Sequence, residues 1–239
     1  MSTARPPGTS IACGGDELVL NNHLPSGDQD RLSSPAVRAR SSPVAKFNNR
    51  KPGLPVGGTT AASPVGDSDN NWNVCSYELF AGNEQLDRDE RMVAAKDLDD
   101  QRILGDALAA ADVTGCARVN IIGFCMGGMY TLKAVKTKRF HRHVPFYGMI
   151  HVPDNWRGAG QGDPLDAVRQ GDPRRVLAVI GTADPFTPPD VVDELEAVGV
   201  TVVRYHGADH AFVHDPDRPV HNAQYAIDAW ARAINWLNS

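Results

Sequence analysis

The sequence contains no apolar run that approaches the roughly 18–20 residues needed to cross a bilayer. Its first residues, "MSTARPPGTSIACGGDE", lack the apolar core of a secretory signal peptide. Basic residues are not in excess either, because 24 Lys and Arg stand against 29 Asp and Glu, for a formal net charge of −5. This balance argues against general binding to nucleic-acid phosphates. Together these absences predict a cytoplasmic protein with no membrane and no nucleic acid among its partners.

Cysteine is also scarce. The chain has four, at positions 13, 75, 116 and 125, with no C-x-x-C pair and no zinc-ribbon spacing. Free thiols in a reducing compartment are the simplest account of this pattern. At most one of the four, Cys125, is placed for chemistry.

Regular patterning is missing from the first third of the chain. Residues 1–76 contain 8 Gly, 8 Pro and 10 Ser, and the only compact apolar run is "ELVL" at 17–20. Gly and Pro break regular elements, and so little apolar surface offsets little of the entropy lost on ordering. We therefore predict an irregular or partly disordered segment over 1–76, followed by a folded domain over 77–239. The alternative is that this segment supplies short strands, with "WNVCSYELF" (72–80) the best candidate.

Regular periodicity begins near residue 84. Apolar residues at helical spacing predict one long helix or a broken one over 86–111. Further elements alternate after it: strands at 118–122, 144–150, 176–181 and 200–206, and helices after Gly128, at 188–199 and at 221–237. Such alternation is typical of a parallel sheet flanked by helices, so the predicted fold class is α/β.

The closing helix, 221–237, is expected to pack on the sheet through one apolar face. The residues assigned to that face are Ala223, Ala226, Ile227, Trp230, Ile234 and Leu237.

In an open parallel sheet, functional residues lie in the loops at the carboxyl ends of the strands. The first of the four predicted strands ends in "GFCMG" (123–127), which is the nucleophile-elbow pattern with sulfur in place of oxygen. Cys125 would begin a helix, where partial positive charge favours a thiolate. The backbone N–H of Met126 would point to where an oxyanion develops. Taken alone, the motif is equally compatible with a buried structural cysteine.

Two more reactive side chains follow later strands. Asp184 lies in "GTADPFTPP" and His210 in "HGADHAF". Separately they are compatible with a turn aspartate and an exposed loop histidine. With Cys125 they form the chain order of α/β-hydrolases: nucleophile, acid, histidine. The histidine would accept the thiol proton and later protonate the leaving group, while the carboxylate orients the imidazole and stabilises its cation.

The segments "GFCMGG", "VPFYG", "GTADPFTP" and "GADHAFVHD", in this order, resemble the dienelactone hydrolase family over roughly 78–239. The resemblance implies an α/β-hydrolase fold that cleaves a lactone or small carboxylic ester through a thioacyl-enzyme intermediate. It implies Cys125 as nucleophile, Asp184 as orienting acid and His210 as base, with no metal or organic cofactor. We expect a small-molecule ester or lactone as substrate and a monomer or small homo-oligomer. Tyr147 and Trp156 are candidates for substrate binding, although plain packing would also explain them.

The chain departs from the family pattern in three places. No motif in the first third corresponds to the family's leading strands and to the loop that carries a glutamate and a second oxyanion N–H. The arginine expected soon after "ELFAG" is replaced by Gly82 or Asn83. After the histidine, Ala211 stands where a hydroxyl is expected, and His214 and Asp215 stand where an arginine is expected. These differences predict a substrate other than an anionic dienelactone.

Three other interpretations remain. The protein is a non-catalytic or weakly active member of the fold if its N-terminal half is incomplete. A metal site is conceivable at His210 and His214, beside Asp209 and Asp215, but a loop position gives their i, i+4 spacing no common face. A redox thiol would need a resolving cysteine, and Cys116 precedes the strand at its opposite end.

Overall fold

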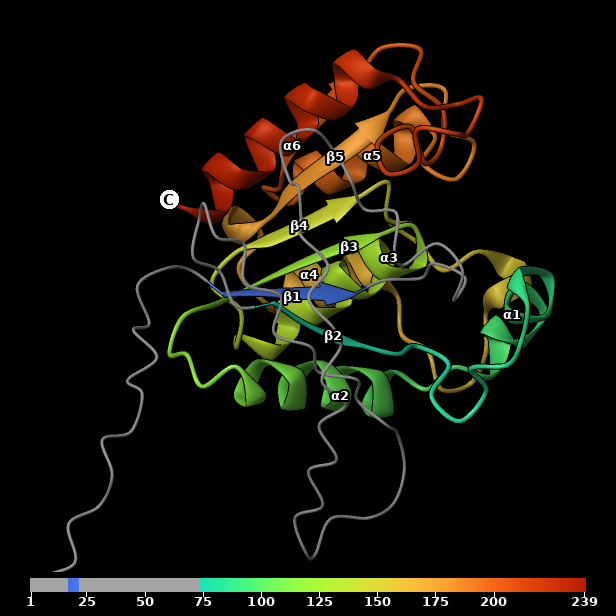
Figure 1. Ribbon diagram of the computed structural model, residues 1–239, viewed down its shortest axis with the longest axis vertical. Helices are drawn as coiled ribbons and strands as arrows, with labels where there is room; N and C mark the ends of the chain where they lie inside the picture. The colour runs from blue at the N-terminus through green and yellow to red at the C-terminus, as the bar shows by residue number, and fades with distance from the viewer. Residues whose placement is uncertain (1–16, 22–73) are drawn as a thin grey trace, which may run out of the picture.

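The computed structural model of the protein describes residues 17–21 and 74–239. In this part of the chain six parallel strands form one sheet with the order β2-β1-β3-β4-β5-β6 (Figure 1). The strands are β1 (Glu17–Asn21), β2 (Val74–Tyr77), β3 (Val119–Phe124), β4 (His143–Phe146), β5 (Leu177–Gly181) and β6 (Thr201–Tyr205). The α-helices are α1 (Arg88–Ala94), α2 (Asp100–Val113), α3 (Met126–Lys133), α4 (Pro164–Gln170), α5 (Pro189–Ala197) and α6 (Ala223–Leu237). Short 3₁₀ turns are η2 (Ala95–Asp97), η3 (Ala134–Thr137), η4 (Asp154–Trp156) and η5 (Pro173–Arg175).

The predicted α/β class is confirmed, and the four predicted strands are present as β3 to β6. The strand predicted at 144–150 is too long, because β4 ends at Phe146. Tyr147 takes a positive φ of 39°, which turns the chain out of the strand. Gly148 then packs directly on the backbone of α3, where an added Cβ would lie 2.4 Å from the carbonyl carbon of Gly128. This close approach turns the backbone away from the strand path.

Two stretches of the N-terminal segment belong to the sheet. The run "ELVL" lies in β1, between β2 and β3, and β2 falls within the candidate stretch 72–80. The short-strand alternative therefore holds for these two stretches, and the sheet has strands on both sides of residue 77. The rest of the segment predicted as irregular lies outside the described residues. Asn21 pairs opposite Gly123, so β1 ends beside the predicted elbow.

The helix predicted over 86–111 is a broken one. Asp87 begins α1 with a reciprocal capping box to Glu90. Leu98 is extended, with φ −66° and ψ 140°, and Asp99 then caps α2 by accepting the N–H of Gln101. Side-chain acceptors of this kind satisfy the free N–H groups at a helix start, so each Asp begins a new helix.

The sheet is covered on both faces, and β3 shows how. Its six residues are all buried. Ile121 belongs to the core cluster that contains residues of α2 and α3, whereas Ile122 belongs to the cluster that contains residues of α6. Figure 1 shows α6 and α2 on different sides of the strands, as this alternation requires.

The face predicted for α6 is partly wrong. Ile227 is 57% exposed and Ala223 is also exposed. The buried residues of this helix are Ala226, Ala229, Ala233 and Leu237. Three small side chains let the helix approach the sheet closely, and Trp230 packs its ring 5.2 Å from that of Phe146.

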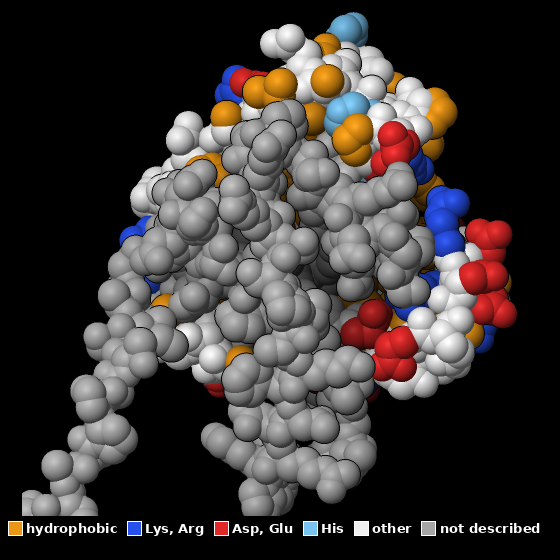
Figure 2. Space-filling model, viewed as in Figure 1, with side chains coloured by type: hydrophobic (Ala, Val, Ile, Leu, Met, Phe, Trp, Pro, Cys, Tyr) orange, Lys and Arg blue, Asp and Glu red, His pale blue; other side chains and the backbone are white. Residues whose placement is uncertain are grey.

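The described surface on the side of α1 has mixed charge. Acidic and basic side chains lie side by side there in Figure 2, in agreement with a chain whose charges nearly balance. No helix in the described ranges has the length and apolar character required to cross a membrane.

Candidate active site

The turn between β3 and α3 carries Cys125 in a strained conformation, with φ 54° and ψ −119°. A non-glycine residue in this region costs energy and persists only where its surroundings hold it. The N–H of Cys125 donates to Phe146 O at 3.0 Å, and its carbonyl accepts the N–H of Met129 at 3.0 Å. A Cβ on Gly123 would lie 2.2 Å from Gly127 O. The turn therefore has the tightness that a nucleophile elbow requires.

The Cys125 side chain is half-buried and packs against two core clusters, on either side of β3. Met126 is the first residue of α3, and the first N–H groups of a helix have no acceptor within it. The described geometry thus leaves the Met126 N–H as a donor next to the sulfur. This is the position in which the predicted oxyanion donor would act.

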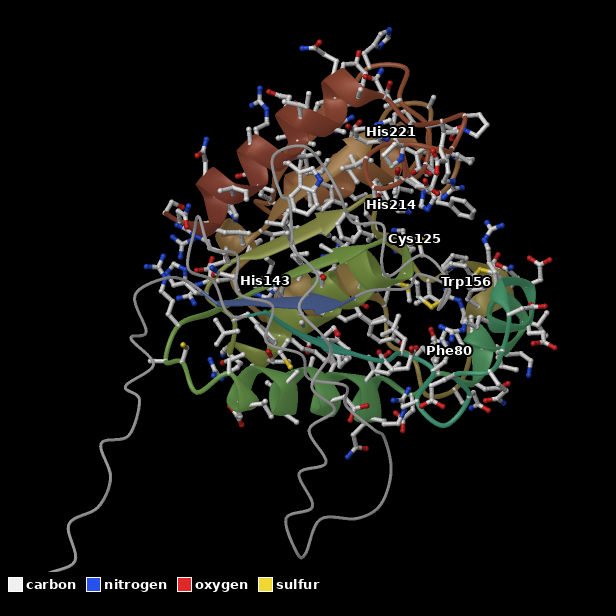
Figure 3. All side chains as sticks on the ribbon, in the orientation of Figure 1. Phe80, Cys125, His143, Trp156, His214 and His221 are labelled. Carbon is white, nitrogen blue, oxygen red and sulfur yellow. The ribbon has the colours of Figure 1, made fainter. Side chains whose placement is uncertain are left out.

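The structure brings Asp184 and His210 together. Nδ1 of His210 donates to Oδ2 of Asp184 at 2.8 Å. The Asp184 side chain is completely buried, and its other oxygen accepts the N–H of Phe186 at 2.8 Å. The two residues follow β5 and β6, while Cys125 follows β3, so all three loops meet at the carboxyl edge of the sheet. The strand arrowheads point to this edge in Figure 1, and Figure 3 shows Cys125 and His214 on the same side.

The electrostatics of His210 set it apart from an ordinary loop histidine. Burial lowers the pKa of its imidazole, but hydrogen bonding to Asp184 and interaction with Cys125 outweigh burial and raise the pKa to about 9. Its Nε2 is buried and makes no well-aligned hydrogen bond within the described chain. We attribute this to a thiol close enough to act on the imidazole but outside ideal hydrogen-bond geometry, as is common before substrate binds.

Tyr147, predicted as a substrate-binding residue, lies beside His210. Its ring is completely buried and meets the His210 ring edge-on, with centroids 5.2 Å apart. Its hydroxyl forms a hydrogen bond with Nδ1 of His214. Burial, and then the charge of Cys125, hold the pKa of this phenol well above its ordinary value. The phenol is therefore protonated and can donate to His214.

Two residues of this site were not predicted to have a catalytic or substrate-binding role. His214 is half-buried, and burial followed by the charge of Arg218 lowers its pKa to about 4. Phe186 is 47% exposed and packs its ring edge-on to His210, with centroids 4.9 Å apart. The sequence offered one signal that could have identified these two residues. Phe186 lies two positions after Asp184 and His214 four positions after His210, so each shares a loop with a predicted site residue.

The second predicted substrate-binding residue, Trp156, lies in η4 and is 4% exposed. It belongs to the core cluster that Cys125 borders and that also contains Phe80. Figure 3 shows Trp156, Phe80 and Cys125 on the same side of the molecule. Contact between Trp156 and a substrate stays a prediction.

The metal and redox alternatives gain no support from the described residues. His210 is hydrogen-bonded to Asp184 and His214 to Tyr147, and no group of three or more His, Cys, Asp or Glu residues in residues 17–21 and 74–239 could hold a metal ion. Cys116 is buried between α2 and β3, before the amino end of that strand.

The parallel sheet, the strained strand–turn–helix at Cys125 and the loops after β5 and β6 define an α/β-hydrolase fold. The sequence model of the dienelactone hydrolase family matches residues 74–239. The chain belongs to the dienelactone hydrolase family.

Relatives and solved structures agree with this assignment. The chain is 29% identical over 157 residues to a Bradyrhizobium protein named "Probable 2-oxo-3-(5-oxofuran-2-ylidene)propanoate lactonase", covering 61% of this chain and 62% of the relative. It is 34% identical over 151 residues to a Methylorubrum extorquens protein named "Putative carboxymethylenebutenolidase", covering 58% of this chain and 50% of the relative. The chain thus matches less than two thirds of the length of either one.

Among solved structures, a Klebsiella pneumoniae protein titled "Putative Dienelactone Hydrolase" superposes with a TM-score of 0.60 at 25% identity, covering 72% of this chain and 76% of that one. Esterase 2 of Thermogutta terrifontis superposes with a TM-score of 0.56 at 13% identity, covering 98% and 85% of the two chains. At that identity the second similarity concerns the fold alone.

Proposed function

We propose that the protein hydrolyses a lactone or small carboxylic ester, with Cys125 as nucleophile, His210 as base and Asp184 as the acid that orients it. The observation that carries the proposal is His210, which hydrogen-bonds a buried Asp184 through Nδ1 while Cys125 acts on the same imidazole. Each residue then has the neighbour that its role requires. The printed names of the two curated relatives, a lactonase and a carboxymethylenebutenolidase, support the same substrate class.

The reaction proceeds in two halves. Because its pKa is about 9, His210 holds the thiol proton at neutral pH before the reaction begins. The Cys125 sulfur then attacks the carbonyl carbon, and the Met126 N–H donates to the resulting oxyanion. The C–O bond breaks as His210 gives its proton to the leaving alcohol oxygen, which leaves a thioester on Cys125. Water then loses a proton to His210 and attacks the thioester, and the sulfur leaves as a thiolate. A lactone yields one hydroxy acid, whereas an open ester yields an alcohol and an acid.

A second oxyanion donor would come from the chain that follows β1. Asn21 lies opposite Gly123 in the register of β1 and β3, so β1 ends beside the elbow. Loss of one such donor typically lowers kcat by about 10²–10³-fold. A weakly active protein is therefore the expected outcome if this part of the chain supplies none.

The test combines ester turnover with thiol labelling. The p-nitrophenyl esters of short acids serve as substrates for the wild type, for Cys125→Ala and for Cys116→Ala, whose cysteine is buried away from the elbow. We expect Cys125→Ala to lose at least about 10³-fold in kcat/KM, as happens when a nucleophile is removed. Cys116→Ala should retain turnover, and iodoacetamide should label Cys125 in parallel with loss of activity.

Unchanged ester turnover in Cys125→Ala would exclude the thiol mechanism. A Cys125 that reacts with iodoacetamide no faster than Cys116, in a wild type without turnover, would favour the non-catalytic alternative. A thioacyl adduct on Cys125, seen by mass spectrometry after rapid acid quench, would establish the intermediate.

A further inference from the structure

We propose that His214 is a positioning residue, which fixes the Tyr147 ring through its hydroxyl and thereby holds the His210 imidazole toward Cys125. The proposal rests on the proposed function, since it gives His214 a role in aligning that triad. It starts from a hydrogen-bonded pair that the reaction itself does not use, the phenol of Tyr147 and Nδ1 of His214.

The His210 imidazole is held on three sides. Asp184 binds Nδ1 at 2.8 Å, and the rings of Tyr147 and Phe186 meet it edge-on at 5.2 Å and 4.9 Å. One hydrogen bond fixes the direction of Nδ1 but still permits the ring to tilt about that bond. Phe186 is 47% exposed, whereas Tyr147 is completely buried. Of the two aromatic rings that contact His210, that of Tyr147 is therefore the more rigid.

Tyr147 in turn depends on its hydroxyl. Its backbone leaves β4 with a φ of 39°, and its ring packs against other aromatic rings that offer no polar partner. These are Phe124, Phe146 and Phe212, with centroids 6.0, 6.2 and 5.9 Å away. A buried phenol without a hydrogen bond costs about 1–3 kcal/mol. The acceptor on His214 therefore selects one orientation of the Tyr147 ring.

His214 suits this role because it is neutral. With a pKa of about 4, its Nδ1 keeps a free lone pair at ordinary pH and can accept the phenol proton. A cation at this position would offer no acceptor and would place a second positive charge near His210. The ring of His214 also contacts those of Tyr147 and Phe124, at 5.7 Å and 5.6 Å, which limits its own rotation.

Three variants test the proposal. His214→Leu removes the acceptor, Tyr147→Phe removes the donor, and His214→Asn keeps an acceptor oxygen close to the place of Nδ1. The readouts are the ¹⁵N-histidine NMR titration of His210, the rate of Cys125 alkylation by iodoacetamide at pH 7, and kcat and KM for p-nitrophenyl acetate.

We expect His214→Leu and Tyr147→Phe each to slow alkylation by roughly three- to tenfold, the range of one lost hydrogen bond. Each should lower the His210 pKa from about 9 and reduce kcat more than KM. The double variant should lose little more than either single one, because both act through the same bond. His214→Asn should restore most of the alkylation rate that His214→Leu loses.

The matched control is His143→Asn, since His143 is also buried but lies at the opposite end of the sheet (Figure 3). It should lower the melting temperature without changing the His210 titration. If His214→Leu and Tyr147→Phe likewise lower only the melting temperature, the positioning role is wrong. If His214→Leu does not fold, Tyr147→Phe decides by the same criterion. The NMR and alkylation readouts do not depend on ester turnover, so failure of the proposed function is seen separately.

Discussion

Two histidines at opposite ends of the sheet, the buried His143 and the half-buried His210, differ in their protonation. His143 begins β4, at the amino edge, and its Nδ1 lies 3.2 Å from Thr131 O. Burial lowers its pKa to about 4. His210 follows β6, at the carboxyl edge, and has a pKa of about 9 because Asp184 and Cys125 outweigh the effect of burial.

The difference shows what turns a buried histidine into a candidate base. Burial disfavours the charged imidazole at both positions, and only a nearby negative group reverses the direction of the shift. A carbonyl oxygen, as at His143, favours the charged form too weakly to do so. The buried carboxylate of Asp184 is therefore the feature that separates the two regions.

The largest expected effect comes from removing that feature with Asp184→Asn. The amide carries no charge and cannot stabilise the imidazolium, so the pKa of His210 should fall toward or below its ordinary value, as at His143. We expect kcat for ester hydrolysis to fall by about 10³–10⁴-fold. Histidine NMR and p-nitrophenyl ester kinetics measure the two effects. A His210 pKa still near 9 in this variant would show that Cys125 alone accounts for the shift.

A second variant tests the strained backbone at the carboxyl edge. A Cβ on Gly123 would lie 2.2 Å from Gly127 O and 2.5 Å from Oγ1 of Thr131. Gly123→Ala should therefore destabilise the fold by about 3 kcal/mol and disturb the elbow. Gly105→Ala is the matched control, because Gly105 sits inside α2 and a Cβ added there would meet no atom within 4 Å. Urea unfolding that gives equal stabilities for the two variants would contradict this account of the turn.

The third expected effect appears only in acid and tests the comparison at His143. Its folded pKa, about 4, lies below the ordinary 6.5, so the unfolded chain binds the extra proton. Its contribution to stability is present above pH 6.5 and is lost as pH falls toward 4, by roughly 3 kcal/mol. For His210 the folded pKa lies above the ordinary 6.5, so the pH dependence of its contribution to the free energy of unfolding is reversed. That contribution is full below pH 6.5 and is lost as pH rises through about 9.

Urea unfolding from pH 7 to pH 4.5 tests this difference in sign. His143→Asn, which cannot titrate, should show a shallower loss of stability in acid than the wild type. His214, with a pKa also about 4, contributes to the acid loss in both proteins and so cancels in the comparison. An identical pH dependence in wild type and variant would contradict a buried neutral His143.

Much of the site could be predicted because its signals are local. "GFCMG" specifies a tight turn through the glycines around Cys125, and the loops with Asp184 and His210 directly follow apolar strands. Since the carboxyl ends of parallel strands meet at one edge, the order of these motifs was enough to predict that Asp184 and His210 would meet, as they do at 2.8 Å. The catalytic roles of the three residues stay predictions.

Other features depended on contacts between distant segments. The run "ELVL" is too short for its position in the sheet to be predicted from sequence. It is an inner strand only because it pairs with both β2 and β3. Hydrophobicity assigned Ile227 to the core, but the spacing between α6 and the sheet favours alanines and leaves Ile227 exposed. The apolar run through Tyr147 predicted a longer strand, but the approach of Gly148 to Gly128 ends it at Phe146.

Local patterning was thus sufficient for the alternation of strands and helices, the elbow and the order of the three candidate residues, because steric and turn preferences act over a few neighbouring positions. Only the tertiary structure decided that a buried carboxylate reverses the effect of burial on His210. It also decided that Tyr147 finds its acceptor on His214, 67 positions further along the chain. Burial and hydrogen bonding are properties of groups brought together by packing, and no stretch of sequence carries them alone.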